Sequence, residues 1–303
     1  MTTDKKAAKK KAGNCSQCVR CDLCGVDDAE PLIEKQGAFY VRCRRCGFIY
    51  SNPQFSDPLD VNREYFQENM QAYIDTHHVA TKKQRRHARV IKMLEPYRQT
   101  NRILEVGCNT GGFVSMAQQM GWQATGIELV EDLVRYGREE KGLDLICGTL
   151  EEADLSDNEF DAVFSNAVIE HLASPASMLD QVLRVLRPGG VVYTRTLNYD
   201  SHTADMCGDN WRLLAPAGHP SIFTSDTLQR FHKNAGLEIL SVCSGRVHVP
   251  RRGNGLCSRA LKRLFLNLLV HFTLRGDRVA VLARKPKCQP DAGRQETKEI
   301  AHE

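Results

Sequence analysis

The stretch RILEVGCNTGGF, residues 102–113, decides the fold of this 303-residue chain. Its first five residues form an apolar run typical of a buried strand, and a glycine-rich turn follows. Gly107 and Gly111 stand in a G-x-x-x-G spacing, which differs from the G-x-G-x-x-G of dinucleotide-binding loops. Glu105 beside the turn would repel a pyrophosphate and would suit an ammonium or sulfonium group. We therefore expect a strand, a tight turn and a ligand other than a dinucleotide.

The same alternation of apolar runs and amphipathic segments continues along the chain. We expect further strands at 123–127, 144–147, 160–165, 191–195 and 278–283. Helices are expected between them, and 188–190 (Pro-Gly-Gly) should end the helix that begins at Ser174-Pro175. Strand–helix alternation with short connections predicts an α/β fold with a parallel sheet and helices on both faces. Ligands of such sheets bind at the carboxyl ends of the strands, so Glu128 is placed to accept hydrogen bonds from a ribose.

Cysteines near the N-terminus indicate a metal site. Cys21, Cys24, Cys43 and Cys46 form C-x2-C-x18-C-x2-C, and a glycine follows each pair. Four thiolates close a tetrahedral zinc shell and leave no position for water, so the expected zinc ribbon is structural. Cys15 and Cys18 could replace Cys21 and Cys24, although neither is followed by glycine, and an iron–sulfur cluster is an alternative occupant.

Five stretches together resemble class I S-adenosylmethionine-dependent methyltransferases between residue 102 and about 245. They are ILEVGCNTGGF (103–113), TGIE (125–128), FDAVFSNAVIEHLASP (160–175), RVLRPGG (184–190) and TLN (196–198). The resemblance implies the Rossmann-like sheet of that family, with S-adenosylmethionine as cofactor. It places the methionine moiety at Glu105, Gly107 and Gly111, the ribose at Glu128, the adenine at Thr149-Leu150 and the methyl-donating side at Asn166-Ala167. Cys108, Asn109 and Leu129 complete the implied cofactor site.

A zinc ribbon ahead of such a core resembles a bacterial group that methylates sugars, polysaccharides or secondary metabolites. Residues 208–240 fit that group and the ubiquinone-type O-methyltransferases. A small molecule or glycan, methylated at a hydroxyl, is therefore the expected acceptor. His171 and His219 follow the fourth and fifth strands and are candidate general bases. An RNA methyltransferase and a non-catalytic binding module are the alternatives.

Composition sets the boundaries and the expected compartment. Residues 1–14 carry five lysines and one aspartate, so the net charge of +4 lies in this tail and the rest sums to zero. A neutral body makes nucleic acid an unexpected partner. No signal peptide or long apolar stretch is present, so we expect a cytoplasmic protein. The expected organisation is a disordered tail (1–14), the ribbon (15–53), a helical lid or linker (54–97), the methyltransferase domain (98–285) and a disordered tail (286–303).

Two further segments have two interpretations each. Tyr65 and Tyr73 could form a lid over the cofactor or pack against the ribbon. Residues 258–272 predict a very apolar helix, which we expect in the core before the last strand, with peripheral membrane contact as the alternative. The sequence fixes neither the acceptor nor the oligomeric state.

Overall fold

The computed structural model describes residues 15–35, 37–55, 68, 81–245, 247–248, 266–267, 270 and 273–287. Tyr65 and Tyr73, the basic tail 1–14, most of the expected helix 258–272 and nearly all of the tail 286–303 lie outside these residues. Among the described helices, none has the length and apolar character needed to cross a membrane.

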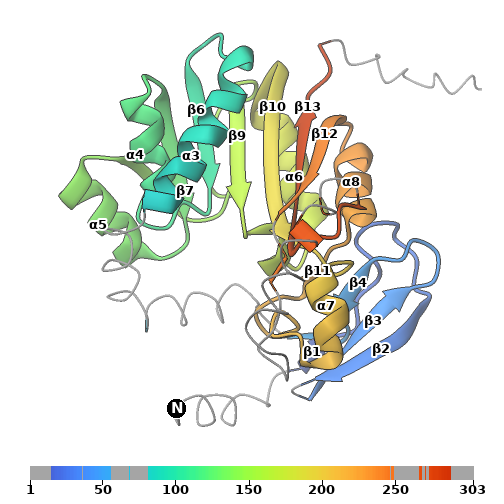
Figure 1. Ribbon diagram of the computed structural model, residues 1–303. Coiled ribbons are helices and arrows are strands. Elements are labelled where there is room, and N and C mark those ends of the chain that lie inside the picture. The colour runs from blue at the N-terminus through green and yellow to red at the C-terminus, as the bar shows by residue number, and fades with distance from the viewer. Residues whose placement is uncertain are drawn as a thin grey trace, which may run out of the picture.

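A seven-stranded sheet forms the centre of the molecule (Figure 1), in the order β12-β13-β10-β9-β6-β7-β8. Its strands are β6 (Arg102–Val106), β7 (Gln123–Glu128), β8 (Asp144–Cys147), β9 (Phe160–Asn166), β10 (Leu186–Leu197), β12 (Glu238–Ser244) and β13 (Arg278–Arg284). The first five run parallel, β13 runs antiparallel to β10, and β12 runs antiparallel to β13. The chain adds β7 and β8 on one side of β6 and β9 and β10 on the other. The strand order therefore reverses at β6, directly below the glycine loop.

Helices cover both faces of the sheet, as the sequence predicts. α3 (Thr81–Leu94), α4 (Gly112–Gln119) and α5 (Glu131–Lys141) contribute to the core on one face, and α6 (Pro175–Val185) and α8 (Ser225–Asn234) to the core on the other. Neighbouring residues of one strand point to opposite faces, so Ile103 packs in the first core and Leu104 in the second. Shorter helical segments are η1 (Glu95–Tyr97), η2 (Ile169–His171), α7 (His202–Cys207) and η3 (Gly208–Asn210).

The fifth strand begins earlier than the sequence predicts. We expected Pro188-Gly189-Gly190 to separate a helix from a strand at 191–195, but β10 runs from Leu186 to Leu197 and includes these three residues. The register shifts between Leu186 and Val191, so the extra residues form an irregularity beside β9. Gly190 is required there, because a Cβ atom would lie 2.9–3.0 Å from three backbone oxygens.

The N-terminal cysteine region forms part of a second sheet and does not stand apart from the core. β2 (Ala29–Lys35), β3 (Ala38–Cys43) and β4 (Ile49–Ser51) pair antiparallel, and β11 (Ser221–Ile222) adds a fourth strand from a distant part of the chain. β1 (Cys15–Gln17) pairs with β5 (Gln54–Phe55). Phe48 is 1% exposed and its ring lies 4.9 Å from that of Phe231 on α8. The ribbon is therefore packed into the same core as α6 and α8.

Candidate active site and metal centre

The glycine loop follows β6 and begins α4, as the sequence predicts. Gly107, Asn109 and Gly111 all have positive φ, at 73°, 53° and 73°. A Cβ atom on Gly107 would lie 2.3 Å from Val168 Cγ2, and one on Gly111 would lie 2.4 Å from Leu143 Cδ1. Asparagine adopts this backbone more readily than other residues with a side chain, which explains Asn109. A larger side chain at either glycine would collide with its neighbours, so the glycines let the loop turn tightly and pack closely against Val168 and Leu143.

Glu105 is the last residue but one of β6, just before this loop, and it is 7% exposed. Among the described residues, its Oε2 atom has no hydrogen-bond partner. Burial raises the pKa of this carboxyl well above its ordinary value, while the Lys83 ammonium on α3 acts in the opposite direction. A buried carboxylate with an unused acceptor fits a cationic ligand such as an ammonium or sulfonium group.

Glu128 ends β7 and faces the same loop. Its Oε2 accepts the Asn109 amide at 2.8 Å, and its Oε1 accepts the Leu129 amide at 2.9 Å and the Val130 amide at 3.2 Å. Burial raises the pKa of Glu128, and the three amide donors oppose that shift. A carboxylate has about four acceptor positions, so one remains on Oε2 for a ribose hydroxyl. Glu128 thus fixes the glycine loop and keeps the capacity expected of a ribose ligand.

The remaining cofactor candidates differ in what their side chains can reach. Cys108 is 3% exposed and packs under Gly126, and Leu150 is 3% exposed in the core below α6. Contacts of these two residues with a cofactor would therefore come from backbone atoms. Thr149 accepts the Glu152 amide on its hydroxyl at 3.2 Å and donates its own amide to Glu152 Oε2 at 2.9 Å, which shapes the turn after β8.

Asn166 and Ala167 end β9 on the other side of the loop. Asn166 Oδ1 accepts a hydrogen bond from Arg195 Nη1 at 3.0 Å, and the Ala167 amide donates to the Arg195 carbonyl at 2.8 Å. Ala167 has φ 60°, and the next residue, Val168, is the one that closes over Gly107. The carboxyl ends of β6, β7 and β9 therefore surround one loop, as expected for a ligand at the reversal point.

Residues 66–242 match a family model described as a methyltransferase domain, which covers more than half of the chain. The chain belongs to this methyltransferase family. It is 29% identical over 143 residues to the malonyl-[acyl-carrier protein] O-methyltransferase of Enterobacter lignolyticus, which is 47% of this chain and 56% of that protein. It is also 29% identical over 161 residues to the ubiquinone biosynthesis O-methyltransferase of Azoarcus sp., which is 49% of this chain and 69% of that protein.

Solved structures of methyltransferases share the fold. A S-adenosylmethionine-dependent methyltransferase of Thermotoga maritima, described as a possible histamine N-methyltransferase, superposes with TM-score 0.51 at 18% identity, over 73% of this chain and 97% of that chain. A putative methyltransferase of Haloferax volcanii, solved in complex with the Trm112 methyltransferase activator, superposes with TM-score 0.54 at 14% identity, over 73% and 98% of the two chains. The Rossmann-like sheet expected of class I methyltransferases is confirmed.

The structure of the methyltransferase brings His171 and His219 together. Their ring centroids lie 4.7 Å apart. In the sequence they are distant: Gly218, the residue before His219, comes 47 positions after His171. The His171 Nδ1 lies 2.6 Å from the Gly218 carbonyl oxygen, and the His219 Nδ1 lies 2.8 Å from the Leu213 carbonyl oxygen. A carbonyl can only accept, so both Nδ1 atoms carry a proton, and in a neutral ring Nε2 is then the acceptor. The two candidate bases, one from the segment after β9 and one from the segment after β10, therefore lie next to each other.

Sequence reasoning missed a buried ion pair next to these histidines. Glu170 is 1% exposed and accepts hydrogen bonds from Thr196 Oγ1 at 2.7 Å and from Arg278 Nη1 at 3.1 Å. Burial and the neighbouring His171 lower the pKa of His219, and the Glu170 carboxylate partly offsets this. The run Thr194-Arg195-Thr196 in an otherwise apolar strand was the available signal, since polar residues in a central strand need partners.

The four predicted zinc ligands form one cluster. Their sulfur atoms all lie within 4.8 Å of one another, with Cys21 Sγ 3.3 Å from Cys46 Sγ and Cys24 Sγ 3.6 Å from Cys43 Sγ. Sulfurs that share a tetrahedral zinc ion at a bond length of about 2.3 Å are about 3.8 Å apart, so these separations fit the metal. The four cysteines are free thiols. Of the alternatives, Cys18 is exposed and outside the cluster, and the side chain of Cys15 is not described.

Tight turns shape both halves of this cluster. Gly25 has φ 72° and donates to the Cys21 carbonyl at 2.7 Å, and Gly47 has φ 75° and donates to the Cys43 carbonyl at 2.8 Å. Glycine is the residue that adopts this backbone without strain, as the sequence pattern predicts. Burial raises the pKa of Cys46 to about 11. Metal binding would have to displace thiol protons, so affinity for zinc should rise with pH.

The ribbon is bonded to the histidine pair. Tyr40, which is fully buried on β3, donates its hydroxyl to the His219 carbonyl at 2.7 Å and accepts the Ala215 amide at 3.1 Å. Asp22, between the first two cysteines, accepts the Ser174 hydroxyl at 2.9 Å and the Ala176 amide at 2.8 Å at the start of α6. The ribbon therefore holds the segment that carries His219 and the segment that follows His171.

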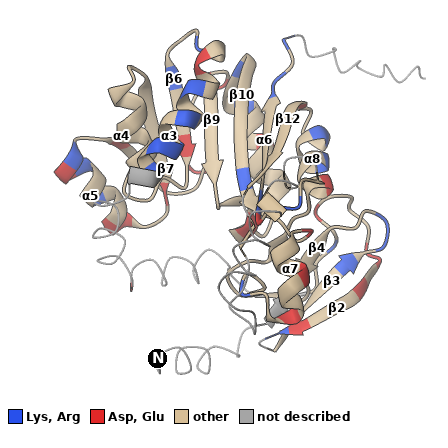
Figure 2. Ribbon diagram, viewed as in Figure 1, with Lys and Arg blue, Asp and Glu red and all other residues tan. Residues whose placement is uncertain are grey.

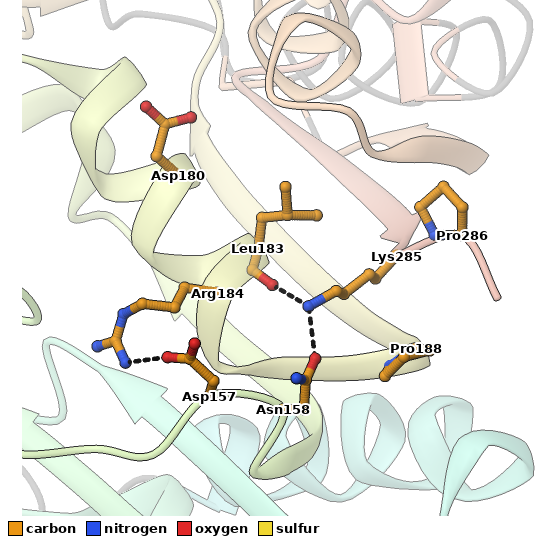
Figure 3. A pocket seen from close by; sticks show the side chains of 8 residues that line it. All are labelled: Asp157, Asn158, Asp180, Leu183, Arg184, Pro188, Lys285 and Pro286. Carbon is orange, nitrogen blue, oxygen red and sulfur yellow. Dashed lines mark hydrogen bonds and ion pairs between the residues drawn. The ribbon is translucent and has the colours of Figure 1, made fainter. Parts of the chain in front are cut away.

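A cavity of about 430 Å³ lies at the other end of the strands, away from the glycine loop (Figure 3). Its lining comes from the turn before β9, the end of α6 and the residues after β13. Lys285 lines it and is 7% exposed. Its ammonium donates to Asn158 Oδ1 at 2.7 Å, to the Leu183 carbonyl at 2.7 Å and to the Leu186 carbonyl at 2.8 Å. All three donors are used, so this lysine closes the carboxyl end of α6 and is not aimed at a ligand.

Proposed function

We propose that this methyltransferase transfers the methyl group of S-adenosylmethionine to a hydroxyl of a small molecule. The observation that carries the proposal is the pair of histidine rings, which meet where the chain continues from Val168, the residue that closes over Gly107. Two of the relatives are named as O-methyltransferases, which supports oxygen as the accepting atom. Lys, Arg, Asp and Glu are spread over both sheets and their helices in Figure 2, although α3 carries only Lys and Arg. The sequence after residue 14 has no net charge, which supports a small molecule over RNA.

The cofactor site fits S-adenosylmethionine by its chemistry. Glu105 has the unused buried acceptor for the cationic methionine part, and Glu128 has the acceptor for the ribose. Gly107 and Gly111 give the loop the positive φ of its tight turn between these two carboxylates. When bound, the cofactor supplies an activated methyl group on a sulfonium. The chain must then position the acceptor in line with it and exclude water.

His219 or His171 would accept the proton of the hydroxyl on Nε2. Burial keeps His219 neutral at pH 7, which leaves its Nε2 lone pair available. The Nδ1–H of each ring is fixed by a backbone carbonyl, so neither ring needs to change tautomer before it accepts a proton. Glu170 then stabilises the imidazolium that forms, because its carboxylate is fixed nearby.

Zinc would be structural in this scheme. Four thiolates close the shell, so the ion offers no position to substrate. Through Tyr40 and Asp22, a metal-loaded ribbon would hold the segments that carry His219 and follow His171.

Transfer of a labelled methyl group tests the proposal. Zinc-loaded protein is incubated with radiolabelled S-adenosylmethionine and fractionated extracts, and the labelled product is then identified. We expect an O-methyl product, and we expect His219→Gln or His171→Gln to lower kcat by about 10²-fold or more, the usual contribution of a general base. His248→Gln, at an exposed position, is the matched control. Wild-type rates in both histidine variants, or an N-methyl product, would contradict the proposal.

A further inference from the structure

Arg195 is a largely buried cation at the acceptor end of the sheet. It lies on β10, where it pairs in register with Asn166 on β9 and with Ala280 on β13. Asn166 Oδ1 accepts a hydrogen bond from Arg195 Nη1 at 3.0 Å. Within the part of the chain that the structure describes, no carboxylate forms an ion pair with it. By contrast, Arg187 is paired with Asp161 and Arg278 with Glu170.

The charged groups around Arg195 are positive, and the neighbours that could become negative are not ionised at pH 7. Burial lowers the pKa of Arg195, and the Arg86 and Arg278 guanidinium groups act in the same direction. Tyr193 and Cys243 are the nearby groups that could ionise, but burial raises the pKa of Tyr193 to about 12 and also raises that of Cys243. Both are therefore neutral at pH 7. A guanidinium removed from water without a counter-ion is costly, so this position fits an anion brought by a ligand.

The position of Arg195 points to the acceptor and not to the cofactor. Its partner Asn166 begins the turn that leads through Ala167 to Val168 over Gly107, so Arg195 borders the expected methyl-donating side. The methionine part of the cofactor is expected at Glu105 on β6, two strands away, or about 10 Å at the usual strand spacing.

We propose that the acceptor carries a carboxylate beside its hydroxyl and that Arg195 binds this carboxylate. This inference rests on the proposed function. Asn166 uses one N–H of Arg195, and the remaining donors can hold both oxygens of a carboxylate. The reaction also favours an anion, because an anionic acceptor next to Arg195 faces a cationic sulfonium.

Binding to the whole protein, saturated with S-adenosylhomocysteine, tests this inference. The probes are salicylate, mandelate and 3,4-dihydroxybenzoate, each compared with its primary amide by saturation-transfer NMR. We expect at least one acid to bind the wild type ten-fold or more tightly than its amide. Arg195→Gln should abolish that preference and change the affinity for S-adenosylmethionine less than two-fold. Arg135→Gln, on the exposed side of α5, is the matched control and should behave as the wild type.

Three outcomes are distinguishable. A wild type that binds S-adenosylmethionine but prefers none of the acids overturns the inference and leaves the proposed function intact. An Arg195→Gln variant that loses S-adenosylmethionine affinity ten-fold also overturns it, because Arg195 would then serve the cofactor. A folded wild type that binds no S-adenosylmethionine overturns the proposed function itself.

Discussion

Phe48→Ala tests whether the ribbon and the methyltransferase core unfold together. Phe48 is 1% exposed and lies among the rings of Tyr50, Phe223 and Phe231, at centroid separations of 5.7, 5.6 and 4.9 Å. Removal of a buried phenyl ring costs about 3–5 kcal/mol, including the cavity that remains. Two of the three partner rings belong to the segment around α8, so most of this loss should destabilise the core and not the ribbon alone.

Urea unfolding followed by circular dichroism at 222 nm measures the effect. The ribbon contributes no helix among its described residues, so this signal reports the helices of the core. With a slope of about 3 kcal/mol per molar urea, the midpoint should fall by about 1–1.7 M. Phe39→Ala is the control, since Phe39 lies on the same ribbon and is 41% exposed, and it should move the midpoint by less than about 0.3 M. An unchanged 222 nm midpoint in Phe48→Ala would refute the shared core.

Three further predictions concern the metal, the base and the closed end of α6. Cys43→Ser should lose about one equivalent of zinc in metal analysis, because one missing thiolate opens the shell, whereas Cys18→Ser should keep it; equal zinc in both variants would contradict the ligand assignment. Methyl transfer should fall as pH decreases through a pKa below 6.5 and be level above it, since His219 must be neutral and its pKa is lowered; a limb centred above pH 7 would count against His219. Lys285→Met should lower the free energy of unfolding by about 2–4 kcal/mol through three lost charged hydrogen bonds, and exposed Lys287→Met should not.

Local patterns predict the parallel sheet because each strand and helix shows its own periodicity. The buried stripe of α3 is an example: His87, Val90, Ile91 and Leu94 are all at most 8% exposed. The turns at the cysteines could also be predicted, since a glycine follows each pair. These two turns bring the four predicted thiols into one cluster.

Non-local contacts were not accessible in the same way. β11 has two residues and completes the ribbon sheet from a position 170 residues after β4, so no local pattern predicts it. Glu170 precedes His171 directly, but its partners Thr196 and Arg278 lie 26 and 108 residues further along the chain, so no local pattern shows the pairing. Arg195 likewise bonds Asn166 from 29 residues away. Pro188-Gly189-Gly190 predicted a break because these residues disfavour helix and strand. Inside β10, however, neighbouring backbone approaches Gly190 so closely that only glycine fits there.

The central claim is that the glycine loop after β6 binds S-adenosylmethionine, and calorimetric titration of the zinc-loaded protein tests it most directly. The account predicts one site per chain with micromolar affinity for the wild type. Gly107→Ala should lose that binding, because the added Cβ would lie 2.3 Å from Val168 Cγ2. Gly142→Ala has a similar positive φ of 62° with open space around its Cβ, and it should bind as the wild type does. A folded wild type that gives no binding heat and no displacement by S-adenosylhomocysteine, or a Gly107→Ala variant of unchanged affinity, would contradict the claim.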